Sequence, residues 1–281
     1  MGVLNVTPDS FSDGGLWAST DAAIEHGLLL RAQGADLIDV GGESTRPGAS
    51  RVAPEEEQRR IIPVVTELAR QGLRLSVDTL NSKTARAAAQ AGASIINDVS
   101  GGLADPDMAV VAAETGLTYV AMHWRAHAQR MDSLADYDDV VADVIVELSA
   151  RVDVLTAAGV SRDRIVLDPG LGFSKKAEHN WQLLNRLDAF AALELPVMVG
   201  ASRKRFLADV LPLGATVLSR DLPTAVVSVL AAQAGAWAVR VHDVAATRTA
   251  LNVLTRTVQS TPRTASELPG ESPSPTQWNH D

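Results

Sequence analysis

The chain has 281 residues, of which 46% are hydrophobic, and its formal net charge is −9. This charge argues against non-specific binding to nucleic acid or to an anionic membrane surface, although local cations can still hold an anionic substrate. The chain contains no cysteine, which excludes a disulfide framework, a thiol nucleophile and a thiolate metal site. This composition fits a reducing compartment and predicts a cytoplasmic protein.

Eight short apolar runs follow one another along the chain, and helical patterns lie between them. The helices are predicted at 20–33, 55–71, 82–91, 106–115, 138–158, 178–192, 222–234 and 244–258. Asn81 is expected to cap the third helix, and Gly34 and Gly92 are expected to end two others. The apolar runs are continuous rather than alternating, as in strands buried on both faces of a parallel sheet.

This order predicts an α/β protein with a single (β/α)8 barrel of the TIM type over residues 1–259, a length typical of that fold. Residues 260–281 are rich in Pro, Ser and Thr, and they are predicted to form a disordered tail. The most apolar long stretch, 222–239, contains Thr224, Ser228 and Gln233. It therefore favours a buried helix running into a strand over a membrane span, and no secretory signal is predicted.

Most of the apolar runs end on a side chain that can do chemistry. In a (β/α)8 barrel the carboxyl ends of all strands open onto one face, where active sites lie. Asp78, Asn97, Asp98 and Asp168 are therefore expected to project into one mouth. Carboxylate and amide groups suit a heterocycle that bears amino and lactam groups. The alternative for each residue alone is that it caps the following turn.

Two glycine-containing loops, 7–15 and 41–49, follow the first two strands. Glycine lets the backbone approach a ligand closely, and Arg46 can pair with a carboxylate. Either loop taken singly could also be an ordinary turn, since Gly, Pro, Asp and Ser mark turns generally.

Cationic side chains follow the seventh and eighth strands. Arg203, Lys204 and Arg205 are consecutive near a predicted helix start, where backbone N–H groups also favour an anion. Arg240 and His242 are two residues apart on a strand, so they point the same way. Barrel enzymes frequently hold phosphate in this region. The alternative for Arg203 and Arg205 is a solvated basic patch.

A bound metal is predicted to be Mg²⁺ rather than a transition metal. His123 and His127 have the spacing of a helical metal pair, but His123 ends a strand and no acidic third ligand has suitable spacing. An oxygen donor such as Asn5 suits Mg²⁺ that is held partly by a substrate phosphate.

Seven motifs, in order and with suitable spacing over residues 2–258, resemble the dihydropteroate synthase family of the folate pathway, which sulfonamides inhibit. They are NVTPDSFSDGG at 5–15, GGESTRPGA at 41–49, SVDT at 76–79, INDVSGG at 96–102, DPGLGFSK at 168–175, GASRKRF at 200–206 and RVHDV at 240–244. The resemblance implies a homodimeric barrel that joins 6-hydroxymethyl-7,8-dihydropterin diphosphate to p-aminobenzoate. The products would be 7,8-dihydropteroate and diphosphate.

The resemblance also implies roles for individual residues. The pterin would be bound by Asp78, Asn97, Met122, Asp168 and Lys204. The p-aminobenzoate would be surrounded by Phe11, Thr45, Arg46, Pro47, Phe173 and Lys204. Asn5 would ligand Mg²⁺ and help Arg240 and His242 to hold diphosphate, while Asp13 and Arg46 would order the two loops. Some family members carry a serine that contacts p-aminobenzoate where this chain has Arg205.

The implied catalytic residues are Asp78, Asp168, Lys204, Arg240 and His242. We expect a dissociative, SN1-like path in which cations neutralise the leaving diphosphate and acids stabilise the cationic pterin. Loop closure would exclude water. Two alternatives remain: a barrel that transfers a methyl group from methyltetrahydrofolate, and an inactive paralogue that binds pterin. The first would not need the Ser-Thr-Arg-Pro loop or the RVHDV cluster, and the second would lack loop residues.

Overall fold

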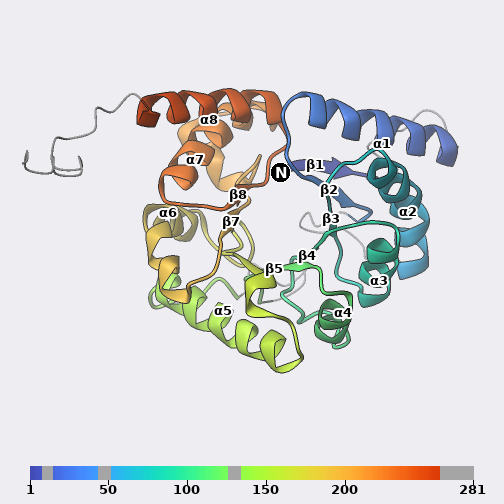
Figure 1. Cartoon of the computed structure of the whole chain (residues 1–281). Helices are drawn as coiled ribbons and strands as arrows, with labels where there is room; N and C mark the ends of the chain where they lie inside the picture. Colours follow the sequence, from blue (N-terminus) through green and yellow to red (C-terminus); the bar gives the residue numbers. More distant parts are fainter. Residues whose placement is uncertain (8–14, 44–51, 126–133, 260–281) are drawn as a thin grey trace, which may run out of the picture.

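The computed structural model describes residues 1–7, 15–43, 52–125 and 134–259. Within these ranges, short parallel strands alternate with helices in chain order, and Figure 1 shows the helices as a ring around the strands. The strands are β1 (Gly2–Asn5), β2 (Ile38–Gly41), β3 (Leu75–Asp78), β4 (Ile95–Asp98), β5 (Thr118–Met122), β6 (Ile165–Asp168), β7 (Met198–Val199) and β8 (Ala238–Val239).

The strands form a closed barrel. Strands β1 to β6 pair in sequence order as one parallel sheet, and β7 pairs with β8 as a second. Two isolated parallel bridges join these sheets at both edges, Leu167 to Val197 and Gly2 to Val241. Each bridge carries a backbone hydrogen bond, from Leu167 N to the Pro196 carbonyl (2.8 Å) and from Val3 N to the Val241 carbonyl (2.9 Å). The predicted (β/α)8 barrel is thus confirmed.

The main helices lie close to the predicted ranges. They are α1 (Gly15–Ala32), α2 (Pro54–Arg70), α3 (Ser82–Gln90), α4 (Met108–Thr115), α5 (Val140–Ala157), α6 (Ala177–Asn185), α7 (Asp221–Gln233) and α8 (Val244–Gln259). Gly34 and Gly92 follow α1 and α3 with φ of 101° and 105°, a conformation that glycine adopts without steric cost. Short 3-10 helices are η3 (Arg162–Arg164), η4 (Leu187–Leu193), η5 (Arg205–Val210) and η6 (Leu218–Arg220).

Three local expectations were wrong. Helix α1 begins at Gly15, ahead of the predicted residue 20, and the single helix predicted at 178–192 is divided into α6 and η4. Asn81 does not cap α3 through its side chain. Its Nδ2 instead donates to Glu57 Oε2 at 2.7 Å, and Asp105 Oδ2 accepts from the Ser82 backbone N–H at 2.8 Å. A long-range acid therefore satisfies the helix terminus where the sequence suggested a local cap.

The inside of the barrel is layered. Met1, Leu37, Ile95, Val120, Val166 and Met198 form a buried apolar cluster. Their strand neighbours Ile38, Ile96 and Leu167 belong to the clusters between the strands and the helices. Because side chains alternate along a strand, residues two positions beyond the inner cluster also face inward, toward the carboxyl end. This inner layer positions Asp39, Asn97, Met122, Asp168 and Gly200.

No helix in the described ranges has the length and apolar character needed to cross a membrane. The predicted tail at 260–281 lies outside the described residues, so its disorder stays a prediction.

Candidate active site at the carboxyl ends of the strands

Four side chains, from β2, β3, β4 and the residue directly after β8, meet inside the barrel mouth. Arg240 donates from Nε to Asp39 Oδ2 at 2.6 Å and from Nη2 to Asp78 Oδ2 at 2.8 Å. Asn97 Nδ2 donates to the same Asp39 oxygen at 3.0 Å. Asp39 and Asn97 are almost inaccessible to solvent. The predicted residues Asp78, Asn97 and Arg240 are therefore brought together, and Asp39 orients two of them.

A role for Asp39 was not predicted, because it lies within β2 and not at the end of the strand. The alternation of β2 could have found it, since Asp39 stands between the inward-facing Leu37 and Gly41. Asp39 Oδ1 has no hydrogen-bond partner among the described residues. A buried carboxylate is costly unless it is paired, and Asp39 is paired with the Arg240 guanidinium, whose position it fixes.

The electrostatics of this group are strongly perturbed. Burial raises the pKa of Asp78 to about 7, with Arg240 opposing the shift and Asp39 adding to it. For Arg240, burial disfavours the cation, but the attraction of Asp39 and Asp78 outweighs it and raises the pKa. The guanidinium therefore stays charged, while Asp78 changes its protonation state near neutral pH.

A second group lies on β6 and the segment after β7. Asp168 Oδ1 accepts from the Gly170 backbone N–H at 2.7 Å. Lys204 Nζ donates to the Leu171 carbonyl and lies 4.8 Å from the centre of the Phe173 ring. A Cβ built on Gly200 would come within 3.5 Å of Asp168 Oδ2 and 3.8 Å of Lys204 Nζ, so both groups face the same open space.

Burial also sets the charges of this second group. It raises the pKa of Asp168, against the attraction of Lys204, and it lowers the pKa of Lys204 to about 8, against the attraction of Asp168. An acid and an amine facing one space with shifted pKa values are typical of functional sites.

His242 is oriented by the segment after β7. Its Nδ1 lies 2.9 Å from Ser202 Oγ, and the same oxygen accepts from the His242 backbone N–H at 3.1 Å. The ring is thereby held against the segment after β7, and its predicted part in holding diphosphate stays a prediction. Ser202 was not predicted to have a role, and its contact depends on a pairing across 40 residues.

Two predicted neighbours do not face the mouth. Arg203 has a φ of 59° and its guanidinium pairs with Asp221 on α7 at 2.7 and 2.8 Å, so it is directed toward a helix. Asp98 accepts from Ser100 Oγ at 2.7 Å and from the Tyr119 hydroxyl at 2.6 Å, within the layer outside the strands. The expectations for Arg203 and Asp98 were therefore wrong. Arg205 is exposed, so Lys204 is the residue among the three consecutive cations that reaches the mouth.

An apolar wall borders the polar groups. Leu80, Val99 and Met122 form a small buried cluster against which Trp124 and Phe173 pack. Met122 and Phe173 were predicted to contact the two substrates, whereas Trp124 was not singled out. Flat aromatic and thioether surfaces of this kind suit a planar ring.

Asn5 ends β1, and Gly41 of the neighbouring strand β2 is its partner in the register. A Cβ on Gly41 would lie 3.9 Å from Asn5 Oδ1 and 3.8 Å from Asp78 Oδ2, so the amide oxygen opens toward the acid. In the described ranges, no group of three His, Asp or Glu residues is arranged to hold a metal ion. One protein amide oxygen agrees with a Mg²⁺ ion whose other ligands are substrate oxygens and water.

The remaining predicted residues lie outside the described ranges. They are Phe11 and Asp13 in 8–14, Thr45, Arg46 and Pro47 in 44–51, and His127 in 126–133. Their proposed contacts stay predictions.

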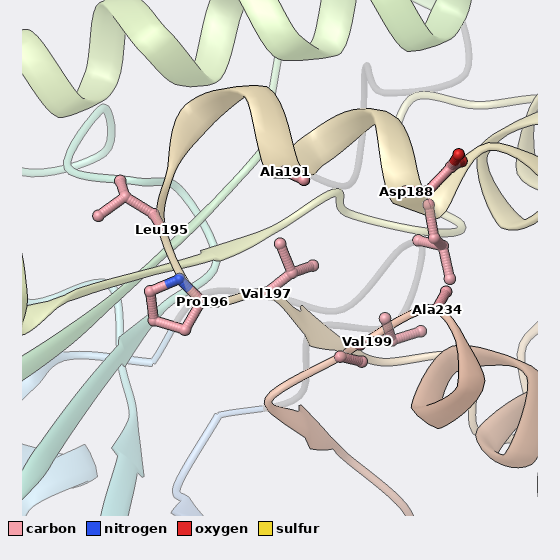
Figure 2. A pocket seen from close by; sticks show the side chains of 10 residues that line it. Asp188, Ala191, Leu195, Pro196, Val197, Val199 and Ala234 are labelled. Atoms are coloured by element: carbon pink, nitrogen blue, oxygen red, sulfur yellow. The ribbon is translucent and has the colours of Figure 1, made fainter. Parts of the chain in front are cut away.

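An open pocket lies elsewhere, as Figure 2 shows, and it is lined mainly by apolar residues of η4, of the turn after α7 and of the segment that leads into β7. Pro196 and Ala236 precede β7 and β8, so this pocket opens near the amino ends of the strands. Because barrel chemistry is found at the carboxyl ends, we place the candidate site at the polar mouth instead.

The class of protein is defined by a parallel barrel whose mouth brings together buried acids, an amide, Arg240 and Lys204. The family described as pterin binding enzyme matches residues 1–242, and the chain belongs to that family.

Within the family, the chain is similar to several dihydropteroate synthases. It is 53% identical over 259 residues to the dihydropteroate synthase of Mycobacterium leprae, covering 90% of this chain and 91% of that protein. It is 44% identical over 265 residues to the dihydropteroate synthase of Escherichia coli, covering 92% of each.

Solved structures agree. The Xanthomonas albilineans dihydropteroate synthase with 4-aminobenzoic acid has a TM-score of 0.86 at 45% identity, with 93% of each chain covered. The same enzyme with 7,8-dihydropteroate has a TM-score of 0.83 at 43% identity, covering 93% of this chain and 94% of that one. The Yersinia pestis enzyme in a sulfonamide drug complex has a TM-score of 0.86 at 40% identity, covering 92% and 94%.

Proposed function

We propose that this chain is a dihydropteroate synthase. It joins 6-hydroxymethyl-7,8-dihydropterin diphosphate to p-aminobenzoate and releases diphosphate. The observation that carries the proposal is the convergence of acids, an amide and cations in one barrel mouth. One substrate has a ring rich in hydrogen-bonding groups and a departing anion, and this mouth offers partners for both ends.

The acids and the amide receive the pterin. Asp168 shares its open space with Lys204, and Asn97 and Asp78 lie on neighbouring strands. Carboxylate oxygens accept from the amino and ring N–H groups of a pterin, whereas Lys204 and the Asn97 amide donate to its oxygen and nitrogen atoms. The wall formed by Met122 and its neighbours covers a face of the ring.

The cations receive the diphosphate. Arg240 is held charged by Asp39 and Asp78, and His242 is oriented by Ser202. As the CH₂–O bond breaks, negative charge grows on the diphosphate oxygens, and fixed cations stabilise it without reorganising. Bound Mg²⁺ would add charge neutralisation at the same oxygens, and Asn5 is the residue that would hold it.

Bond breaking leaves positive charge on the pterin methylene and ring. Asp168 and Asp78 face this charge and favour a dissociative path. The amine of p-aminobenzoate then forms the C–N bond and loses one proton. Phe173 and the side chain of Lys204 border the space through which the amine enters. We propose that Phe11, Thr45, Arg46 and Pro47 complete this subsite, with Asp13 helping to order the loops. Sulfonamides would compete with p-aminobenzoate there.

We also propose that the protein is a cytoplasmic homodimer. Helix α7 exposes Leu222, Val226 and Leu230, with 73%, 53% and 52% of their surface accessible. These residues recur every four positions, so they form one apolar stripe along the helix. A contiguous apolar surface of this kind is covered at low cost by an identical stripe on a second copy.

The test of the function is diphosphate release from 6-hydroxymethyl-7,8-dihydropterin diphosphate with Mg²⁺, with and without p-aminobenzoate. We expect release that depends on p-aminobenzoate, together with formation of 7,8-dihydropteroate. Tight binding of the pterin substrate without release would favour the inactive paralogue. Removal of Mg²⁺ by a chelator is expected to slow release, and unchanged release would remove the metal from the proposal.

A further inference from the structure

The loop after β6, residues 169–174, carries three contacts of the proposed site. Its Leu171 carbonyl accepts from Lys204 Nζ, and its Phe173 ring lies 4.8 Å from the same nitrogen. Its Gly170 backbone N–H donates to Asp168 at 2.7 Å. The position of this short loop therefore sets the geometry of the aryl-amine subsite.

The loop backbone is held in a costly conformation. Ser174 is a non-glycine residue with a φ of 48°, in the left-handed region. Gly170 has a φ of 68°, and a Cβ there would lie 2.3 Å from the His123 carbonyl oxygen. A strained backbone conformation of this kind is maintained only where contacts with the surrounding residues hold it in place.

Lys175 supplies those contacts from beneath the loop. Its Nζ lies 3.1 Å from the Gly170 carbonyl, 3.0 Å from the Phe173 carbonyl and 2.8 Å from His123 Nδ1. Three acceptors use all three N–H groups of an ammonium. Burial lowers the pKa of Lys175, yet a neutral amine would leave one of these acceptors unpaired. We therefore assign the charged form.

His123 and Glu147 fix the acceptor for that ammonium. Glu147 Oε2 lies 2.9 Å from His123 Nε2, and a carboxylate can only accept, so the ring carries its proton on Nε2. His123 Nδ1 is then free to accept from Lys175. Burial and the nearby ammonium lower the pKa of His123 to about 4, which keeps the ring neutral.

A second tie holds the same loop. The Tyr137 hydroxyl donates to the Ser174 carbonyl at 2.8 Å. The Arg125 guanidinium lies 3.9 Å from the centre of the Tyr137 ring and also pairs with Glu147. The cluster thus couples α5, the end of β5 and the loop after β6.

We propose that Lys175, held by His123 and Glu147, is a positioning residue for the aryl-amine substrate. This inference rests on the proposed function. Lys175 acts through the loop, because its ammonium is occupied by two loop carbonyls and a histidine rather than pointing into the mouth.

The first experiment replaces Lys175 with methionine, which approximates the aliphatic part of the side chain and removes the ammonium with its three donors. We expect KM for p-aminobenzoate to rise about tenfold, because small displacements of positioning groups have large effects. The Kd of the pterin diphosphate should change by less than about threefold, since Asp168 and Asn97 keep their strand positions. The control is Lys176→Met, the same change at the exposed neighbouring lysine, which should leave KM unchanged.

A double-mutant cycle tests whether Lys175 acts through Phe173. Lys175→Met added to Phe173→Leu should raise KM by less than about twofold, whereas multiplicative effects would overturn the inference. If Lys175→Met does not fold, Tyr137→Phe decides, with an expected rise in KM of about threefold from loss of one loop hydrogen bond. An unchanged KM in that variant would also overturn the inference.

These outcomes separate the two proposals. A wild-type protein that releases no diphosphate would refute the proposed function. An active wild-type protein whose Lys175→Met variant is less thermostable but keeps its KM for p-aminobenzoate would refute the positioning role alone.

Discussion

Replacing Asp39 with asparagine removes one charge from the barrel interior and leaves the side-chain volume almost unchanged. Asp39 Oδ2 accepts from Arg240 Nε at 2.6 Å and from Asn97 Nδ2 at 3.0 Å. The amide oxygen of the introduced side chain can take the place of Oδ2 and accept both bonds, but each bond is weaker without the carboxylate charge. The variant therefore leaves Arg240 with Asp78 as its remaining ion-pair partner.

The magnitude follows from these contacts. A hydrogen bond to a charged group contributes about 1.5–3 kcal/mol and a neutral one about 1 kcal/mol. Weakening both bonds and removing the ion pair with Arg240 should lower the free energy of unfolding by about 2–3 kcal/mol. For a domain of this size each kcal/mol corresponds to about 2–4 °C, so Tm should fall by about 4–12 °C. The kcat/KM for diphosphate release should fall about 100-fold, because both Arg240 and Asn97 lose their orientation.

The assays are thermal unfolding and diphosphate release on the same preparations. The matched control is Asp36→Asn, which removes an exposed carboxylate that lies 3.3 Å from Arg248 with 71% of its side chain accessible. An exposed pair of this kind contributes at most about 1 kcal/mol, and this variant should keep wild-type activity. Asp39→Asn with wild-type turnover would show that Arg240 and Asn97 are oriented without Asp39.

Three further outcomes are expected. The pKa of Asp78 is about 7 in the folded protein and near 3.8 in the unfolded chain, so the folded protein binds the proton more tightly. The free energy of unfolding, measured by chemical denaturation, should therefore decline from about pH 4 to pH 7. The decline should be smaller in Asp78→Asn. Gly170→Ala should lower the free energy of unfolding by about 3 kcal/mol or more, because the added Cβ would clash with the His123 carbonyl oxygen. The control is Gly116→Ala, where a Cβ meets nothing within 4 Å and the loss should be about 1 kcal/mol. Equal losses in the two variants would contradict the clash at Gly170. Leu230→Glu should convert the proposed dimer to monomer in sedimentation, whereas the exposed Val146→Glu should not; a wild-type monomer would reject the dimer.

Much of the fold could be predicted from the sequence because strand and helix patterns are local. Continuous apolar runs, glycine after helices and polar strand ends each depend on a few adjacent residues, and they placed Asp78, Asn97 and Asp168 at one mouth. The break between α6 and η4 and the early start of α1 were not visible, since tertiary packing decides where a helix ends. Motif resemblance added roles that local patterns could not supply.

The missed residues share a physical cause. Asp39, Ser202 and Lys175 matter through partners that are distant in sequence, and their separations from Arg240, His242 and His123 are 201, 40 and 52 residues. No local pattern encodes such a pairing. The same holds for Arg203, whose neighbours suggested an anion site but whose partner Asp221 lies 18 residues away.

Asp78 and Asp98 show what decides the fate of a carboxylate at a strand end. Both are the last residues of their strands, and both are buried. In the parallel register, however, Asp78 pairs with Asn97, and residues that pair in neighbouring strands point to the same side of the sheet. Asp98, one position further, must then point outward, where Tyr119 and Ser100 donate to it. If β4 were shifted by one residue against β3, Asp98 would face the barrel interior and Asn97 would face outward. The register of β3 against β4 therefore decides which of these two polar side chains faces the substrate.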